Sequence, residues 1–263
     1  MTTGAGALLR AAHAGPGLAV TVLAGLLALS ADLSAARVAT VTAAVLAGQL
    51  SVGWSNDLRD RVRDATVGRT DKPLATGALS VTTVQRACAL AVVATVVLSL
   101  ACGLLPGLVH LMCVASAWTY NFWLKATVLS WLPYAVSFGG LPVFVHLTGG
   151  SAPPAAVVVG GALIGVGGHL LNVVPDLADD AATGVHGLPH RLGARRSTLL
   201  AVGLLVGATA LLLVSGSLAT ALVVIGAVVV AGLAGLALVG RGRAPFYSAV
   251  GIALTDVVIL VVR

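Results

Sequence analysis

The chain has 263 residues, of which 58% are hydrophobic and only 9% are charged, and its mean hydropathy is +1.04. Because a soluble domain carries about a quarter charged residues, this composition excludes an ordinary soluble protein and indicates an integral membrane protein. The formal net charge is +6, but the basic residues follow the topology described below and indicate no nucleic-acid partner.

Apolar runs long enough to cross a bilayer recur along the whole chain. About 20 apolar residues span the hydrocarbon core as a helix, and backbone in lipid must satisfy its own hydrogen bonds, so we expect an all-α membrane protein. No polar linker interrupts the runs, and residues 1–263 are expected to form a single domain without a removable signal peptide. Nine spans are predicted, at residues 16–36, 38–56, 84–105, 107–124, 127–147, 153–172, 198–214, 217–239 and 244–262.

The basic residues orient these spans. When the N-terminus shares a side with the loops after the second, fourth, sixth and eighth spans, that side carries all lysines and arginines except Arg37 and Arg263. Basic residues concentrate in cytoplasmic loops. We therefore expect a multi-pass protein of the cytoplasmic membrane, with its N-terminus and its long basic loops in the cytoplasm and its C-terminus on the opposite face.

The acidic residues concentrate in two stretches, each at the cytoplasmic end of a predicted span. Residues four apart lie on one helix face, so each stretch predicts a short ladder of side-chain oxygen atoms. The repeat of this pattern four spans later suggests two four-helix halves followed by a ninth helix. The two ladders have the same spacing and are formed by Asn56, Asp60 and Asp64 and by Asn172, Asp176 and Asp180, with Asp57 and Asp179 as further candidate ligands.

Carboxylate and amide oxygens are ligands of hard divalent cations. Mg²⁺ in particular binds through one or two carboxylates together with substrate phosphates, so two facing ladders predict Mg²⁺ ions with a diphosphate between them. One such stretch would more often be a solvated helix end, but two with identical spacing in a chain so poor in acid favour a metal site. Pro175 lies inside the second ladder and is expected to kink its helix.

Basic side chains accompany both ladders. Lysine and arginine offset charge on phosphate oxygens, and Arg69, Lys72 and Lys125 are the candidate diphosphate contacts. The other arginines are expected to act as topology signals or to contact anionic lipids. This second group comprises Arg59, Arg61, Arg63, Arg86, Arg195, Arg196, Arg241 and Arg243.

Together these motifs resemble those of the UbiA superfamily of intramembrane prenyltransferases. Residues 56–64 match the N-D-x-x-D-x-x-x-D motif that the family carries after its second helix, and Asn172, Asp176 and Asp180 match its second Asp-rich motif. Residues 69–74 are similar to the Arg-Pro-x-Arg-Pro-Leu loop, residues 181–184 and 188–193 to the second loop, and Tyr120 with Lys125 to the Tyr-Ser-x-x-x-Lys element. The chain departs from the pattern at Asn172, where many members have Asp, and at Asp179, where Gly is common.

The resemblance implies nine helices around a central cavity and a transferase that moves a prenyl group from a polyprenyl diphosphate to an aromatic or other lipophilic acceptor. Mg²⁺ on Asp60, Asp64, Asp176 and Asp180 would carry the catalysis, and the diphosphate would also contact Arg69, Lys72, Tyr120, Lys125, Asn56 and Asn172. The lipid bilayer is the expected surroundings, and the short outer loops indicate no protein partner.

Two alternatives stay open at this point. The prenyl cation could be captured by its own double bonds, as in a terpene cyclase of the same fold, which needs no acceptor. More remotely, intramembrane acids are typical of cation-coupled transporters, although transporter sites lie near the midplane at broken helices.

A few further polar and aromatic residues stand near or within the spans. His13 is a candidate contact of the acceptor or the diphosphate, and His169 a candidate neighbour of the second ladder. Asp256 is costly in hydrocarbon and is expected to face the bundle interior, either in a structural hydrogen bond or as a proton acceptor. The candidate walls for a prenyl cation are Trp118, Tyr134, Phe138 and Phe144.

Overall fold

The structure is a computed structural model that describes residues 4–12, 14–216 and 218–262. His13 lies outside these residues. Within them the regular elements are all helical: α1 Gly4–Ala11, α2 Ala14–Ser30, α3 Ala35–Thr66, α4 Val81–Ala101, α5 Leu104–Thr119, η1 Tyr120–Leu124, η2 Val128–Trp131, α6 Leu132–Thr148, α7 Ala155–Val173, η3 Val174–Asp176, α8 Leu177–Ala182, α9 Leu188–Leu192, α10 Ala194–Val214, α11 Thr220–Val239 and α12 Ala244–Val261.

Each of the nine predicted spans corresponds to one long helix in the described part of the chain. Seven helical segments are long and apolar enough to cross a membrane. The count of nine is approximate, because α2 and α5 have only 17 and 16 residues. The predicted all-α membrane fold is confirmed. The largest boundary difference is in α3, which continues to Thr66 where the prediction ended the span at residue 56.

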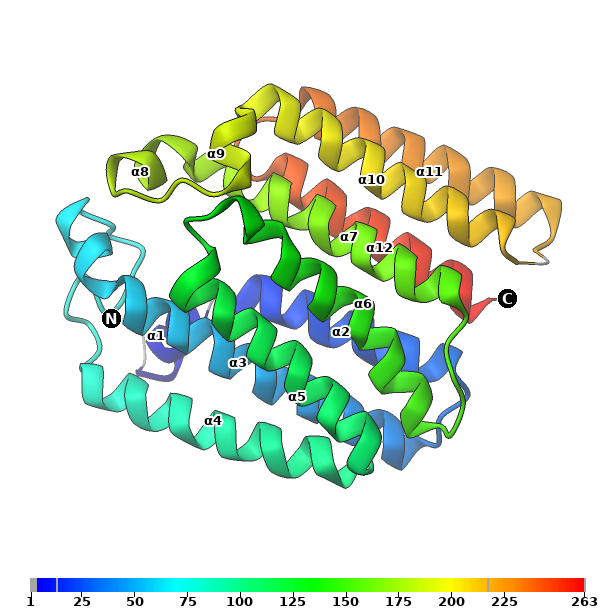
Figure 1. The fold of residues 1–263 in the computed structure, drawn as a ribbon, viewed down its shortest axis with the longest axis horizontal. Coiled ribbons are helices and arrows are strands. Elements are labelled where there is room, and N and C mark those ends of the chain that lie inside the picture. Colours follow the sequence, from blue (N-terminus) through cyan, green and yellow to red (C-terminus); the bar gives the residue numbers. More distant parts are fainter. Residues whose placement is uncertain (1–3, 13, 217, 263) are drawn as a thin grey trace.

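The long helices run along one axis of the molecule (Figure 1). The end of α3, together with α1, α8 and α9, lies at one end of the bundle, and α12 finishes at the other. Neighbours in sequence pack together, as in the pairs α3–α4, α6–α7 and α11–α12, and α2 also packs against α12. This last contact joins the first and last long helices.

Close approach of α6 and α7 depends on glycine. A Cβ atom on Gly165 would lie 2.6 Å from the Tyr134 carbonyl oxygen and 2.6 Å from Phe138 Cβ. Small residues let membrane helices approach closely, and here they bring the aromatic residues of α6 directly onto α7. The glycine-rich sequence of α7 therefore fixes two of the aromatic side chains predicted to form walls.

Candidate diphosphate and metal site

The first acidic ladder lies on an unbroken helix. Because α3 continues through it, Asn56, Asp60 and Asp64 stand on one face, as predicted. Asp60 and Asp64 are buried. Carboxylates are almost never buried unless they are paired, so the partners of these two groups define the site.

The second ladder is interrupted. α7 gives way to the 3₁₀ turn η3 and then to α8. Pro175 lies in the turn, and because proline has no backbone N–H it cannot continue the α-helical hydrogen bonds; the α-helix is thus interrupted at the position where we predicted a kink. Asn172 consequently stands on α7, Asp176 at the end of the turn and Asp180 on α8, instead of on one straight face. Asp179 is exposed.

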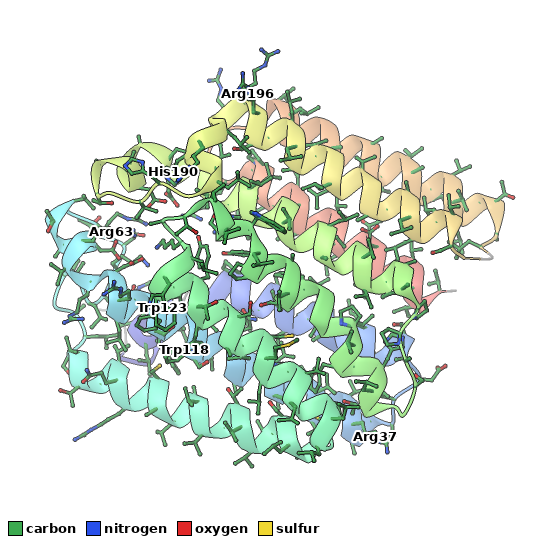
Figure 2. The ribbon with its side chains drawn as sticks, viewed as in Figure 1. Arg37, Arg63, Trp118, Trp123, His190 and Arg196 are labelled. Carbon is green, nitrogen blue, oxygen red and sulfur yellow. The ribbon has the colours of Figure 1, made fainter. Side chains whose placement is uncertain are left out.

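One guanidinium group joins the two ladders. Arg63 Nη2 lies 3.0 Å from Asp60 Oδ2 and 3.5 Å from Asp64 Oδ1, and Arg63 Nη1 lies 3.5 Å from Asp180 Oδ1. Figure 2 shows Arg63 and His190 at the same end of the bundle. Carboxylates from both ladders are therefore close enough to share one cationic group, and Arg63 is more than the topology signal that we expected.

Lys125 reaches the first ladder from the connection between α5 and α6. Its Nζ lies 2.6 Å from Asp60 Oδ2 and 3.5 Å from Asn56 Oδ1. The π-helical turn η1 comes directly before Lys125, and such turns are frequent at functional sites. This predicted diphosphate contact therefore lies within the site.

The other two predicted diphosphate contacts are in the loop after α3. Lys72 is buried, with its Nζ 3.1 Å from Asp57 Oδ1 and 4.0 Å from Asp64 Oδ2. Arg69 donates two hydrogen bonds, of 2.8 and 2.9 Å, to the exposed Asp71. These bonds lower the pKa of Asp71 to about 2. Lys72 thus lies beside the first ladder, whereas the Arg69 guanidinium pairs with a carboxylate of its own loop.

The second ladder has two neighbours of its own. His190 Nε2 lies 3.7 Å from Asp180 Oδ2, and Arg243 Nη2, at the start of α12, lies 3.9 Å from Asp176 Oδ2. Burial lowers the pKa of His190, so its imidazole is neutral at pH 7. Arg243, which we expected to act as a topology signal, also brings positive charge to Asp176.

A junction holds the loop after the second ladder against the connection that carries Lys125. The Leu188 amide donates a hydrogen bond of 3.1 Å to Ser130 Oγ, which also lies 3.1 Å from His169 Nε2. Gly187 packs so closely here that a Cβ atom would lie 2.7 Å from the Lys125 carbonyl oxygen. The two halves of the site are therefore fixed relative to each other through backbone contacts.

An aromatic cluster lies next to this junction. The ring of Tyr134 stacks on that of His169 at 4.4 Å and on that of Phe138 at 6.5 Å, and Tyr120 meets the Tyr134 ring edge-on at 5.1 Å. Tyr120, predicted to contact the diphosphate, belongs to this cluster. Tyr134 and Phe138 thus lie next to the junction, whereas Phe144 is fully buried in the core.

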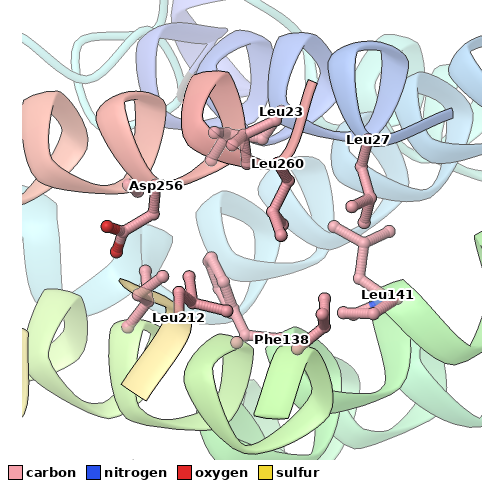
Figure 3. Close-up of a pocket in the computed structure, with 13 residues that line it drawn as sticks. Leu23, Leu27, Phe138, Leu141, Leu212, Asp256 and Leu260 are labelled. Carbon is pink, nitrogen blue, oxygen red and sulfur yellow. The ribbon is translucent and has the colours of Figure 1, made fainter. Parts of the chain in front are cut away.

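Phe138 also lines an apolar cavity of about 50 Å³ deeper in the bundle (Figure 3). Residues of α2, α6, α7, α10 and α12 enclose it. On α7 the cavity residue Ile164 precedes Asn172 of the second ladder by eight residues, which is about 12 Å along a helix, and His169 of the aromatic cluster stands between them. The aromatic cluster therefore lies between an acidic end of the bundle and an apolar interior.

Asp256 is the one acidic residue of this cavity. It is fully buried, as expected for an aspartate facing the interior, and in the described residues neither of its carboxyl oxygens has a hydrogen-bond partner. The nearby Thr209 hydroxyl instead donates to the Leu205 carbonyl at 3.3 Å. Asp256 is thus separate from the two ladders.

The oxygen ligands of the ladders fit Mg²⁺. Among the residues that the structure describes, no three carboxylate, imidazole or thiol groups lie close enough to hold a metal ion unaided. Mg²⁺ does not need such a cage, because it keeps water and substrate phosphates as ligands. Asp60, Asp64 and Asp180 already converge on one cation, Arg63, so carboxylate oxygens of both ladders surround a common positive charge.

Fold and site together define a class: an integral membrane protein built as a helical bundle, with paired acidic motifs at one end. The sequence model of the UbiA prenyltransferase family matches residues 18–245, so the chain belongs to this family. This confirms the resemblance seen in the motifs. A search of curated proteins finds no significant match.

Solved structures support the same fold. The apo structure of a UbiA homologue from Aeropyrum pernix K1 is similar with a TM-score of 0.76 and 18% identity, covering 100% of this chain and 99% of that one. A UbiA homologue from Archaeoglobus fulgidus bound to GPP and Mg²⁺ has a TM-score of 0.72 and 14% sequence identity, and the match covers 98% of this chain and 100% of that one. The structure of a digeranylgeranylglyceryl phosphate synthase has a TM-score of 0.67 and 15% sequence identity, and the match covers 98% of both chains.

Proposed function

We propose that the protein is an Mg²⁺-dependent intramembrane prenyltransferase that moves a prenyl group from a polyprenyl diphosphate to an aromatic or other lipophilic acceptor. The observation that carries this proposal is the convergence of Asp60, Asp64 and Asp180 on one end of the bundle beside Lys125. Family membership supports the reaction class, and the homologue bound to GPP and Mg²⁺ supports the donor and the metal.

The first part of the reaction is departure of the diphosphate. The bond between the prenyl C1 and the diphosphate oxygen breaks, and its electron pair leaves with the diphosphate. Mg²⁺ bound by the two ladders would supply Lewis-acid stabilisation of that negative charge. Lys125, Lys72 and Arg69 would donate charge-assisted hydrogen bonds to the same group, and the asparagines Asn56 and Asn172 would orient the metal-bound end.

The second part is capture of the allylic cation. Electrons of the acceptor form the new bond to C1, and the acceptor then loses a proton. Tyr134, Phe138 and His169 form an apolar and aromatic wall beside the junction, and excluding water there prevents hydrolysis of a reactive intermediate. The cavity beyond Phe138 would take apolar parts of a substrate.

We further propose that residues 1–263 act as one domain in the cytoplasmic membrane, with the ladders on the cytoplasmic side. The positive-inside distribution of the basic residues supports this orientation. The ladders and α1 lie at one end of the bundle and α12 finishes at the other (Figure 1), which agrees with termini on opposite faces.

The test is turnover of a labelled prenyl diphosphate by the purified protein with a panel of lipophilic acceptors. Asp60→Asn and Asp176→Asn are each expected to lower kcat by about 10²–10³, the usual loss when one electrostatic stabiliser is removed, and chelation of Mg²⁺ should have the same effect. Asp32→Asn is the matched control, because Asp32 lies in the turn between α2 and α3. Full turnover in both ladder variants would refute the assignment.

Incubation with the diphosphate alone separates the alternatives. A cyclic hydrocarbon formed without any acceptor would replace transfer by a terpene cyclase reaction on the same ladders. Uptake of a solute into liposomes without release of diphosphate would replace both by transport.

A further inference from the structure

Arg63 was not among the predicted site residues, yet its side chain contacts carboxylates of both ladders. Its guanidinium contacts Asp60 and Asp64 of the first ladder and Asp180 of the second, at 3.0, 3.5 and 3.5 Å, and its side chain is 21% exposed. The first two pairs lie within α3, and in the part of the chain that the structure describes the Arg63–Asp180 pair is the one that links α3 directly to α8. Arg63 is thus a positive charge shared by both ladders.

The neighbouring arginine of the same helix behaves differently. Arg61 is exposed and donates a hydrogen bond of 2.7 Å to the Leu58 carbonyl oxygen. It stands two residues from Arg63, so its side chain points to another side of the helix. Arg61 therefore carries the same charge, on the same turn, without the contacts to the ladders.

The oxygen atoms held by Arg63 are those that a divalent cation needs. Asp60 Oδ2, Asp64 Oδ1 and Asp180 Oδ1 cannot each serve a guanidinium and a metal ion equally well, and the two cations repel each other. A diphosphate changes this balance, because a guanidinium binds phosphate oxygens with two parallel hydrogen bonds. Arg63 then has an alternative partner.

We propose that Arg63 is a resident counter-cation that holds the two ladders together and makes Mg²⁺ binding dependent on the diphosphate. Metal alone has to displace the guanidinium from three carboxylates without providing it with a new partner. Metal that arrives with a diphosphate provides that partner. The inference rests on the proposed function, and it adds that metal and diphosphate bind with positive coupling through this one side chain.

The experiment measures Mg²⁺ binding to the purified full-length protein by calorimetry, without and with methylenediphosphonate as a stable diphosphate analogue. For the wild type we expect the analogue to tighten Mg²⁺ binding about tenfold, within the 5–150-fold range typical of coupled sites. In Arg63→Gln, Mg²⁺ alone should bind about tenfold more tightly than in the wild type, and the analogue should add less than twofold. Arg61→Gln should match the wild type.

A second readout is the thermal stability of the protein without metal, compared with its stability after Mg²⁺ is added. Removing Arg63 takes the shared cation from Asp60, Asp64 and Asp180 and leaves Lys125 beside Asp60 and the more distant Lys72 beside Asp64. The melting temperature of metal-free Arg63→Gln should therefore fall below that of Arg61→Gln, and Mg²⁺ should restore it. Arg63→Lys covers the case in which Arg63→Gln does not fold. A single ammonium group cannot reach both ladders in the fork geometry of a guanidinium. In Arg63→Lys the analogue should therefore tighten Mg²⁺ binding less than in the wild type but more than in Arg63→Gln.

The outcomes separate the inference from the function on which it rests. If the wild type binds Mg²⁺ with the analogue but Arg63→Gln and Arg63→Lys keep the full coupling, the proposal for Arg63 is wrong and the prenyltransferase assignment stands. An equal change of Mg²⁺ affinity in Arg61→Gln also overturns the proposal for Arg63, because the effect would then come from the loss of any positive charge on this helix. If the wild type binds neither Mg²⁺ nor the analogue, both proposals fail.

Discussion

The pair formed by Lys72 and Asp57 allows a sharp test of how the first ladder is held. Their charged atoms lie 3.1 Å apart, and the side chains are 7% and 1% exposed. Lys72→Met would leave the Asp57 carboxylate buried without its cation. Breaking a buried pair from one side costs about 3–5 kcal/mol, and at about 2–4 °C per kcal/mol for a domain of 150–250 residues the melting temperature should fall by about 6–20 °C.

Replacing both partners should recover most of this loss. A well-packed apolar pair is often as stable as a buried ion pair, so the double variant Asp57→Leu with Lys72→Met should melt near the wild type. Arg69→Met is the control, because it breaks a pair whose acidic member, Asp71, is 61% exposed, and such pairs contribute about 0–1 kcal/mol.

Thermal unfolding of the four proteins in one detergent measures these differences, and donor kinetics add a second reading. If Lys72 also binds the diphosphate, the stable double variant should still have a donor KM raised about tenfold or more, since a hydrogen bond to a charged group contributes about 1.5–3 kcal/mol. A double variant that melts no higher than Lys72→Met would refute the argument that Lys72 anchors Asp57.

Three further expectations follow from other parts of the structure. Gly187→Ala should lower kcat/KM about tenfold by displacing the connection that carries Lys125, whereas Gly168→Ala should not, because a Cβ atom there would have no neighbour within 4 Å. Equal activities of the two variants would contradict this expectation. Asp256→Leu should raise the melting temperature, because it removes a buried carboxyl group without hydrogen bonds, whose desolvation costs about 1–3 kcal/mol. A lower melting temperature would show that the Asp256 carboxyl group has a stabilising hydrogen-bond partner. Arg69 lowers the pKa of Asp71 to about 2, below its value in the unfolded chain. The stability contributed by this pair is therefore complete above about pH 4 and is lost as the pH falls towards 2. In unfolding assays, the difference in stability between Asp71→Asn and the wild type should be the same at pH 6 and pH 8.

Much of the fold follows from the sequence because bilayer thickness fixes the length of an apolar helix. The first ladder follows as well, since nothing in residues 56–64 breaks a helix and their spacing then decides the shared face. The second ladder was predicted less completely. Pro175 indicated the kink, but the direction in which α8 leaves η3, and hence which aspartate faces the first ladder, depends on the loop packing against Ser130 and Gly187.

The importance of Arg63 could be predicted only in part. Its spacing of three residues from Asp60 places the two side chains next to each other on a helix, and that signal is present in the sequence. Arg61 stands three residues before Asp64 and would pass a similar test, yet it is exposed. The contact that distinguishes the two arginines is the one to Asp180, and it exists only because α8 lies against the end of α3.

The two departures of the second ladder from the family pattern do not cancel once the structure is considered. Asn172 removes a charge from the ladder, whereas Asp179 adds one on an exposed face, where it is screened by solvent. Arg243 further offsets Asp176. The second ladder is therefore left with Asp176 and Asp180, two carboxylates as in the first ladder, but its side-chain cations are more distant. Arg63 and Arg243 lie 3.5 and 3.9 Å from its carboxylates, whereas Lys125 and Arg63 lie 2.6 and 3.0 Å from Asp60. We expect a divalent cation to displace less side-chain charge from the second ladder, and the first ladder to bind its metal mainly together with a diphosphate that takes over Arg63, in agreement with a coupling that runs through the side chain joining the two ladders.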